Sequence, residues 1–298
     1  MIHPPIAFAG NPLDRVAALR KDARWVEARR GDARAELLVL WRGAVLHERT
    51  EQGSRLLPLT MDALAECGGG EPVLLGLRGD VPVWAVEAGA LPTEPFADLG
   101  AWASLRGLAP HLPPEELAVA GQAHWLLDWH RRHAFCARTG EPTRMAEGGG
   151  KRVADPSGTE HFPRTDPVAI VLPTHEDAVC LGRGPHFPPG FLSAFAGFME
   201  PGETLEECGA RELAEEAGLT AASMTYRLSQ PWPFPASLMV GFEAAVTGRD
   251  LTLDPVEIEE ARWLTREEAR TVLAGEHEVT APPPLAIAHH LLKGWVER

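Results

Sequence analysis

Three glutamates in the second half of the chain, Glu212, Glu215 and Glu216, are spaced in a way that could hold metal ions. Offsets of three and four residues place side chains on neighbouring parts of one helical surface, where like charges repel each other. Such a cluster is costly unless cations neutralise it, and carboxylate oxygens suit Mg²⁺ or Mn²⁺, which also engage phosphate groups. The alternative is a solvated acidic face, the usual explanation of a Glu-rich helix. The flanking glycines favour the metal site.

The residues around the glutamates predict the helix that would carry them. Thr204 followed by Glu207 matches a capping box, which begins a helix, and Gly218 is typical of a helix end. We expect Arg211 and Glu203 to form a charge pair that holds the preceding loop to this helix. Their role would then be supporting rather than chemical.

Residues 197–219 fit the pattern G-x5-E-x7-R-E-U-x-E-E-x-G-U, in which U is aliphatic, without a mismatch. Seven fixed residues, each at a frequency of ~10%, match by chance at ~10⁻⁷ per starting point. This pattern is the Nudix signature, and the chain therefore resembles the Nudix hydrolase superfamily. The resemblance implies an α/β fold, the Nudix α/β/α sandwich with a mixed sheet. It also implies hydrolysis of a nucleoside diphosphate linkage.

The hypothesised chemistry is a metal-assisted attack of water on phosphorus. Metal ions held by the glutamates would stabilise developing charge and lower the pKa of a bound water. Glu216 or its neighbour Glu215 would take the proton of that water, and both assignments stay open. The candidate catalytic residues are Glu216, Glu215, Glu212, Arg211 and Glu203.

A second motif begins ten residues beyond the signature, where residues 229–237 read S-Q-P-W-P-F-P-A-S. Each proline fixes φ, so Trp232 and Phe234 would be presented rigidly, and aromatic faces suit stacking on a flat heterocycle. The motif resembles the one that marks the NADH pyrophosphatase (NAD-capped RNA hydrolase) family. Residues 161–167 are similar to the Y-P-R-x-D-P segment of that family. The resemblance covers roughly residues 120–298.

This second resemblance implies roles for individual residues. The implied metal ligands are Glu212, Glu215, Glu216 and Glu257. The implied substrate site consists of Phe162, Phe198, Gln230, Pro231, Trp232, Pro233, Phe234, Pro235, Ala236, Ser237 and Ala288. The family also implies a homodimer whose subunits jointly build the site. The expected reaction splits NADH or NAD⁺ into AMP and the nicotinamide mononucleotide, and the resemblance allows NAD-cap removal from RNA 5′ ends.

Two other functions stay open. One is a Nudix hydrolase for another nucleotide, such as ADP-ribose or a diadenosine polyphosphate. The other is an NAD(H)-binding regulator that has lost catalysis. Degenerate relatives of that kind usually lose signature glutamates, and this chain keeps all of them, which favours an enzyme.

The zinc ribbon of the family is degenerate in this chain. Family members usually carry four cysteines between their two domains. Here Cys136 keeps the first position, Thr139 stands at the second, and Ala154 and Ser157 occupy the positions of the second pair. A structural zinc takes four nitrogen or sulfur ligands, which one thiolate cannot replace. We therefore expect no zinc, and an ordinary buried thiol at Cys136.

Length and composition indicate a globular protein of two domains, because 298 residues exceed one ordinary domain. The net charge of -14 disfavours nonspecific binding to long nucleic acids. No apolar run approaches the ~20 residues that span a bilayer, and the N-terminus does not read as a signal peptide. We expect a cytoplasmic protein with no membrane partner.

The chain is predicted to have three parts. Residues 1–112 read as a β-rich N-terminal domain, and residues 166–298 as the Nudix hydrolase domain. Residues 113–165 read as a helix followed by the degenerate ribbon. The helix should begin near Pro113 and end near His133. We expect His130 and His133 to place positive charge at its C-terminus, where the helix dipole favours it.

Overall fold

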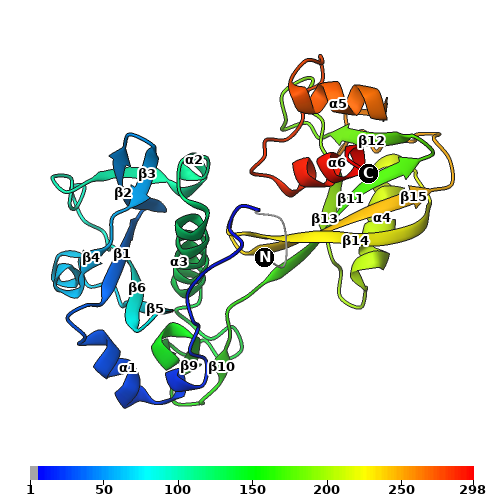
Figure 1. Ribbon diagram of the computed structural model, residues 1–298. Coiled ribbons are helices and arrows are strands. Elements are labelled where there is room, and N and C mark those ends of the chain that lie inside the picture. The colour runs from blue at the N-terminus through cyan, green and yellow to red at the C-terminus, as the bar shows by residue number, and fades with distance from the viewer. Residues whose placement is uncertain (1–5) are drawn as a thin grey trace. The chain divides into compact units, whose positions relative to one another are not determined.

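The computed structural model describes residues 6–298 and divides into two compact units (Figure 1). The N-terminal unit consists of Ala7–Arg164 and the short segment Trp232–Ala236. The C-terminal unit consists of Ile6, Thr165–Pro231 and Ser237–Arg298. Among residues 6–298, no helix is both long and apolar enough to cross a membrane.

The C-terminal unit is built on a mixed sheet of six strands. Its strands are β11 (Asp166–His175), β12 (Ala178–Arg183), β13 (Phe195–Phe198), β14 (Ala221–Trp232), β15 (Ser237–Val246) and β16 (Glu260–Thr265). The order is β14-β15-β11-β12-β16, with β13 paired to β11. The pair β11–β15 is parallel, whereas β11 pairs antiparallel with β12 and β13. β11 is central and buried on both faces, which explains its continuous apolar run.

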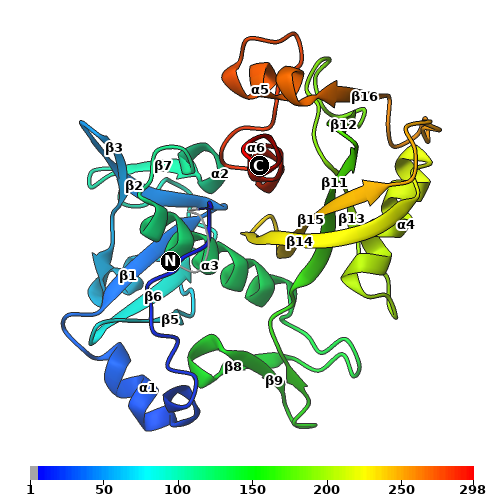
Figure 2. The same ribbon diagram turned by 45° about the vertical axis from the view of Figure 1, so that its right-hand side comes forward.

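Helices cover both faces of this sheet (Figure 2). They are α4 (Leu205–Ala217), α5 (Arg266–Ala274) and α6 (Ile287–Val296). Successive strand residues face opposite sides, and on β15 Val240 and Phe242 share a buried core with residues of α4. Gly241 between them faces α6, since a Cβ built there would touch Ile287 and Leu291. The predicted α/β/α sandwich with a mixed sheet is confirmed.

The N-terminal unit contains a seven-stranded sheet, which confirms the predicted β-rich domain. Its strands are β1 (Glu36–Trp41), β2 (Ala44–Thr50), β3 (Gly53–Leu56), β4 (Leu59–Thr60), β5 (Val73–Arg78), β6 (Val81–Glu87) and β7 (Ala101–Ser104). β1 lies between β2 and β6 and pairs parallel with β6. The strands β5 and β6 form an antiparallel hairpin.

Helices and a second, small sheet complete this unit. The helices are η1 (Leu19–Lys21), α1 (Ala23–Arg30), η2 (Met61–Glu66), α2 (Leu105–Leu108), α3 (Pro114–Arg132) and η3 (Glu147–Gly149). The small sheet consists of β8 (Thr143–Ala146), β9 (Lys151–Ala154) and β10 (Glu160–His161). The predicted helix of residues 113–133 is α3, which begins with a proline in its first turn.

The C-terminal end of α3 corrects one prediction. His130 is buried, and burial lowers its pKa to about 4, so its imidazole is neutral rather than positively charged. Its Nε2 lies 2.9 Å from the carbonyl oxygen of Gly149, and its Nδ1 lies 3.2 Å from Nη1 of Arg152. A guanidinium can only donate, so Nδ1 accepts and Nε2–H donates to Gly149. His130 therefore joins α3 to the hairpin β8–β9.

Candidate active site

α4 begins and ends where the sequence predicts. Thr204 is the N-cap, and its hydroxyl accepts a hydrogen bond from the backbone N–H of Glu207 at 3.2 Å. The Glu207 carboxylate accepts from the backbone N–H of Thr204 at 2.7 Å, which completes the capping box. Gly218 ends the helix in the left-handed region with φ 69°, a conformation that favours glycine.

Two of the three signature glutamates face inward on α4. Glu212 and Glu216 are each 8% exposed, one helical turn apart. The Glu212 carboxyl packs directly against Gly197 of β13, since a Cβ built on Gly197 would lie 1.9 Å from its carboxyl carbon. The signature glycine is therefore needed because it leaves room for this carboxylate.

Burial and mutual repulsion act on both inward carboxyls. Burial above all, together with the charges of Glu212 and Glu257, raises the pKa of Glu216 to about 8. Burial also raises the pKa of Glu212, against the lowering effect of Arg211. Oε2 of Glu216 is buried without a hydrogen-bond partner in the described chain. Both carboxyls thus lie where a cation would be strongly favoured.

Glu215 differs from its two neighbours on α4. Its side chain is 59% exposed, and Nη1 of Arg211 donates to its Oε2 at 3.0 Å. Of the three glutamates predicted to cluster on this helix, Glu212 and Glu216 are therefore buried, and the third is an exposed carboxylate beside them.

Arg211 connects the loop before α4 to the helix. It donates to both oxygens of Glu203, at 2.6 Å and 3.0 Å, so the predicted charge pair is present. It also donates to Glu212 Oε1 at 2.8 Å and to the carbonyl oxygen of Phe198 at 3.0 Å. The guanidinium hydrogen bonds lower the pKa of Glu203 to about 2. Arg211 therefore fixes the loop and one of the two buried carboxyls together.

The fourth predicted metal ligand, Glu257, lies in the turn between β15 and β16. Its backbone N–H donates to the carbonyl oxygen of Asp254 at 3.2 Å, and its charge raises the pKa of Glu212 and Glu216. Within residues 6–298, no three His, Cys, Asp or Glu side chains form a ready-made metal cage. The unpaired Oε2 of Glu216 and the carboxylate charges of Glu212 and Glu257 nevertheless have the chemistry that a divalent cation prefers.

Gln230, an implied substrate-binding residue, is fully buried. Its Nε2 donates to the carbonyl oxygen of Leu285 at 2.8 Å, and its Oε1 accepts from the backbone N–H of Ile287 at 2.9 Å. Both ends of the amide thus bind the backbone at the start of α6. The neighbouring Ala288, another implied substrate residue, is 4% exposed. The structure therefore gives Gln230 a positioning role for α6.

The aromatic residues of the second motif pack within the N-terminal unit. Phe8 makes edge-to-face contacts with Trp232 and Phe234, whose rings lie 5.9 Å and 5.6 Å from its own. The guanidinium of Arg106 lies 4.7 Å from the Phe234 ring centroid, and His124 of α3 lies 5.5 Å from the same ring. Trp232 and Phe234 therefore already have ring and cation partners.

The remaining implied substrate residues are found in varied surroundings. Phe198 of β13 is 61% exposed, and Phe162, after β10, is 63% exposed. Pro233, Ala236 and Ser237 are buried, Pro231 is half-buried, and Pro235 is exposed. Phe162 belongs to the N-terminal unit and Phe198 to the C-terminal unit. Each of these two aromatic side chains is exposed in its own unit.

In the degenerate ribbon, hydrogen bonds between hydroxyl and carboxylate groups connect the positions where the family has cysteines. The Glu141 carboxylate accepts from the hydroxyl of Thr139 at 2.9 Å and from that of Ser157 at 2.5 Å. Cys136 is buried at the start of this turn. The backbone N–H of Cys136 donates to the carbonyl oxygen of Glu141 at 2.8 Å.

Sequence reasoning missed several residues at the motif loop. Phe8, Arg106, Gly121 and His124 all approach Trp232–Ala236, and a Cβ on Gly121 would lie 2.9 Å from the Phe8 ring. They come from three separate parts of the N-terminal unit. No spacing in the sequence relates them, so only the tertiary structure reveals this group.

Two family models match the chain, one in each unit. The NUDIX domain matches residues 163–284, which hold the signature and the second motif. The NADH pyrophosphatase-like rudimentary NUDIX domain matches residues 34–129, which hold the N-terminal sheet and most of α3. The N-terminal unit is thus similar to a reduced form of the same domain, which its sequence alone did not indicate.

Curated relatives are similar over most of the chain. The NAD-capped RNA hydrolase NudC of Mycobacterium bovis is 40% identical over 238 residues, 76% of this chain and 75% of that protein. The NAD-capped RNA hydrolase NUDT12 of Macaca fascicularis is 42% identical over 197 residues, and the match spans 43% of its length. A NUDIX hydrolase crystal structure from Nitrosomonas europaea is 24% identical, with a TM-score of 0.42 over 55% of this chain and 90% of that chain.

Proposed function

The chain belongs to the Nudix superfamily and, within it, to the family of the NAD-capped RNA hydrolases, and from this premise we propose that it hydrolyses the diphosphate linkage of NADH or NAD⁺. The products would be AMP and the nicotinamide mononucleotide. One observation carries the proposal above the others. The buried carboxyl pair of Glu212 and Glu216 lies against Gly197, inside a signature without a mismatch.

Individual residues of the site have different proposed roles. Glu216 is our choice of proton acceptor over Glu215, because its Oε2 is buried and unpartnered whereas Glu215 is exposed and bound by Arg211. Arg211 orients Glu212, and Glu203 holds Arg211 in place. The buried setting excludes water that would otherwise screen these charges.

A divalent cation fits the same carboxylates. We propose that Glu212, Glu216 and Glu257 hold Mg²⁺ or Mn²⁺, with Glu215 beside them as an exposed carboxylate. When bound, such an ion neutralises diphosphate charge and lowers the pKa of water. The proposal predicts that EDTA abolishes turnover and that Mg²⁺ or Mn²⁺ restores it.

Two further features of the family are proposed for this chain. The names of its relatives support NAD-cap removal from RNA 5′ ends as an additional activity. We also propose a homodimer, as the resemblance implies, and Phe162 and Phe198 as exposed substrate-binding residues. Sedimentation of the full chain measures this oligomeric state directly.

Product analysis with a panel of substrates tests the proposed reaction. NADH, NAD⁺, ADP-ribose, a diadenosine polyphosphate and NAD-capped RNA are each incubated with the same preparation and Mg²⁺ or Mn²⁺. We expect AMP and reduced nicotinamide mononucleotide from NADH. If only ADP-ribose or the diadenosine polyphosphate is cleaved, the assignment to nicotinamide dinucleotides is wrong. Tight NADH binding without cleavage of any substrate would instead indicate a regulator.

A further inference from the structure

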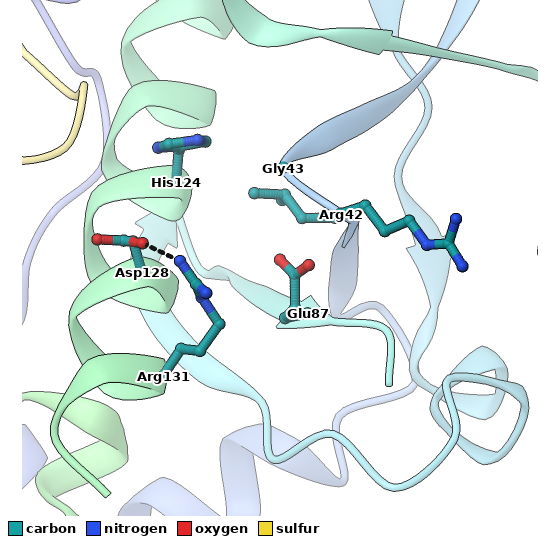
Figure 3. A pocket seen from close by; sticks show the side chains of 7 residues that line it. Arg42, Gly43, Glu87, His124, Asp128 and Arg131 are labelled. Carbon is teal, nitrogen blue, oxygen red and sulfur yellow. Dashed lines mark hydrogen bonds and ion pairs between the residues drawn. The ribbon is translucent and has the colours of Figure 1, made fainter. Parts of the chain in front are cut away.

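A polar cavity of about 360 Å³ lies in the N-terminal unit, and none of its lining residues is a candidate catalytic or metal-binding residue (Figure 3). Leu40 and the turn Arg42–Gly43 form one wall, and Glu87 at the end of β6 forms the floor. The other wall is α3, which contributes His124, Asp128 and Arg131. These three are spaced four and three residues apart, so they share one face of the helix.

Glu87 is the acceptor in this cavity that lacks a side-chain partner. Among residues 6–298, it forms no ion pair and no hydrogen bond with another side chain, and its carboxylate accepts from the backbone N–H groups of Arg42 and Gly43. Burial raises the pKa of its carboxyl, while the backbone N–H groups of Arg42 and Gly43 lower it. In Figure 3 the carboxylate points toward the space between the turn and α3.

The other charges at the cavity are already paired or point elsewhere. Asp128 accepts from Arg131 at 2.5 Å and from Arg132 at 2.6 Å, one on each oxygen. The guanidinium of Arg42 lies 4.6 Å from the ring centroid of Trp41 and extends away from the cavity. Arg131 has five N–H donors, so some remain available after its bond to Asp128.

His124 adds an imidazole ring to this wall. Burial is the main cause that lowers the pKa of His124, and its Nδ1 is buried without a hydrogen-bond partner in the described chain. A ligand here would therefore meet four groups: the Glu87 carboxylate, which has lone pairs left beyond its two backbone hydrogen bonds, the remaining N–H donors of Arg131, the flat ring of His124 and the apolar side chain of Leu40.

We propose that this cavity binds a planar ring whose edge carries an N–H donor next to an acceptor, the chemistry that nicotinamide and adenine share. The donor would meet Glu87 and the acceptor would meet Arg131, with the ring against His124 and Leu40. A simple organic cation would satisfy Glu87 but face the guanidinium of Arg131. The volume lies near the lower end of the ~300–1,000 Å³ range of ligand sites, which suits one ring rather than a whole dinucleotide.

Calorimetric titration of the full chain in EDTA tests this site. Nicotinamide and adenine are titrated separately, with pyridine as a ring without the donor–acceptor edge and agmatine as a simple cation. We expect nicotinamide, adenine or both to bind at least about tenfold tighter than pyridine or agmatine, since hydrogen bonds to charged groups are the stronger ones. The compound that binds more tightly shows whether the cavity takes a nicotinamide or an adenine ring.

Two variants locate the binding. Glu87→Gln should weaken it at least about tenfold, whereas Glu48→Gln, an exposed change on β2, should leave it unchanged. If Glu87→Gln shows no cooperative thermal unfolding transition, and is therefore not folded, Arg131→Gln at the exposed end of the site replaces it. This variant should likewise weaken binding at least about tenfold. Binding that is equal in these variants and the parent, preferential binding of agmatine, or no binding of either ring overturns the proposal.

The proposed ligand site and the proposed reaction are tested independently, so one can be disproved while the other holds. The titration contains no metal ion and measures no turnover, so a chain that cleaves no NADH can still bind nicotinamide in a Glu87-dependent way. A chain that cleaves NADH and binds neither ring keeps the proposed function and loses this site.

Discussion

The guanidinium of Arg211 holds Glu203 through two hydrogen bonds, from Nε to Oε1 at 2.6 Å and from Nη2 to Oε2 at 3.0 Å. Because the same guanidinium also binds Glu212 and the Phe198 carbonyl, it orients one of the two buried carboxyls. A single planar group thus connects the loop, β13 and α4. The signature arginine acts here as a positioning residue.

Arg211→Lys should lower kcat/KM about 10–100-fold, a range typical of residues that orient metal ligands. Lysine keeps the charge, but its single ammonium cannot replace the two parallel hydrogen bonds to Glu203. Steady-state kinetics over a series of Mg²⁺ concentrations measure the effect, and the Mg²⁺ requirement should rise. Arg227→Lys, on β14, serves as the control. Kinetics equal to those of the parent protein would contradict the positioning role.

Gly197→Ala should lower kcat about 100-fold while the protein remains folded. The new methyl would lie 1.9 Å from the Glu212 carboxyl carbon, so this side chain must move, and small misplacements of catalytic groups have effects of about this size. Gly248→Ala is the matched control, because a Cβ there meets nothing within 4 Å. Kinetics and thermal unfolding of both variants check the prediction. A Gly197→Ala enzyme with normal kcat would show that Glu212 is dispensable in this position.

The neutral His130 should make stability depend on pH. Its folded pKa is lowered to about 4, below its ordinary value of 6.5, so the unfolded chain binds a proton that the folded chain does not. The free energy of unfolding is therefore highest above pH 6.5 and falls as the pH drops toward 4, by about 3 kcal/mol from this group. Urea unfolding at several pH values measures this fall.

His130→Gln provides the comparison for that measurement. Glutamine retains a donor for the Gly149 carbonyl but does not titrate, so the variant should lose less stability between pH 6.5 and 4 than the parent protein. Parallel curves for the two proteins would mean that His130 does not contribute to the acid sensitivity.

Gln230→Glu should destabilise the protein by about 1–3 kcal/mol, because the Leu285 carbonyl loses its donor in a fully buried place. Thermal unfolding and the KM for NADH are measured together, with the exposed Gln52→Glu as control. A residue that only bound substrate would raise KM and leave the unfolding temperature unchanged. That pattern would contradict the positioning role of Gln230.

Features set by local chemistry could be predicted from the sequence. The side chains of Thr204 and Glu207 cap the start of α4, and Gly218 ends it. The Arg211–Glu203 pair joins this helix to the loop just before it, within the fixed spacing of the signature. The mixed sheet followed from the signature's resemblance to a known superfamily.

Features set by tertiary contacts could not be predicted. The contacts of Phe8 and Arg106 with Trp232 and Phe234 join residues remote in the sequence, and the stacking of these two rings on a substrate stays a prediction. His130 was expected to carry charge because the helix dipole favours it, yet burial outweighs that effect. The exposure of Glu215 beside two buried neighbours likewise depends on β13, which the sequence did not identify.

The proton acceptor is the central element of the proposed function. Glu216→Gln preserves the size of a buried side chain while removing the carboxylate that repels Glu212 and Glu257. Glu206→Gln, an exposed change in the first turn of the same helix, is the control. Both variants should unfold at temperatures close to that of the parent protein, or higher for Glu216→Gln.

The most direct test is therefore the turnover of NADH by the parent protein, Glu216→Gln and Glu206→Gln at saturating Mg²⁺ or Mn²⁺, with AMP as the measured product. We predict that the parent protein and Glu206→Gln release AMP and that kcat of Glu216→Gln falls by at least about 100-fold, as expected for loss of a carboxylate that holds the metal ion and takes the proton. Near-normal release of AMP by Glu216→Gln would contradict the account.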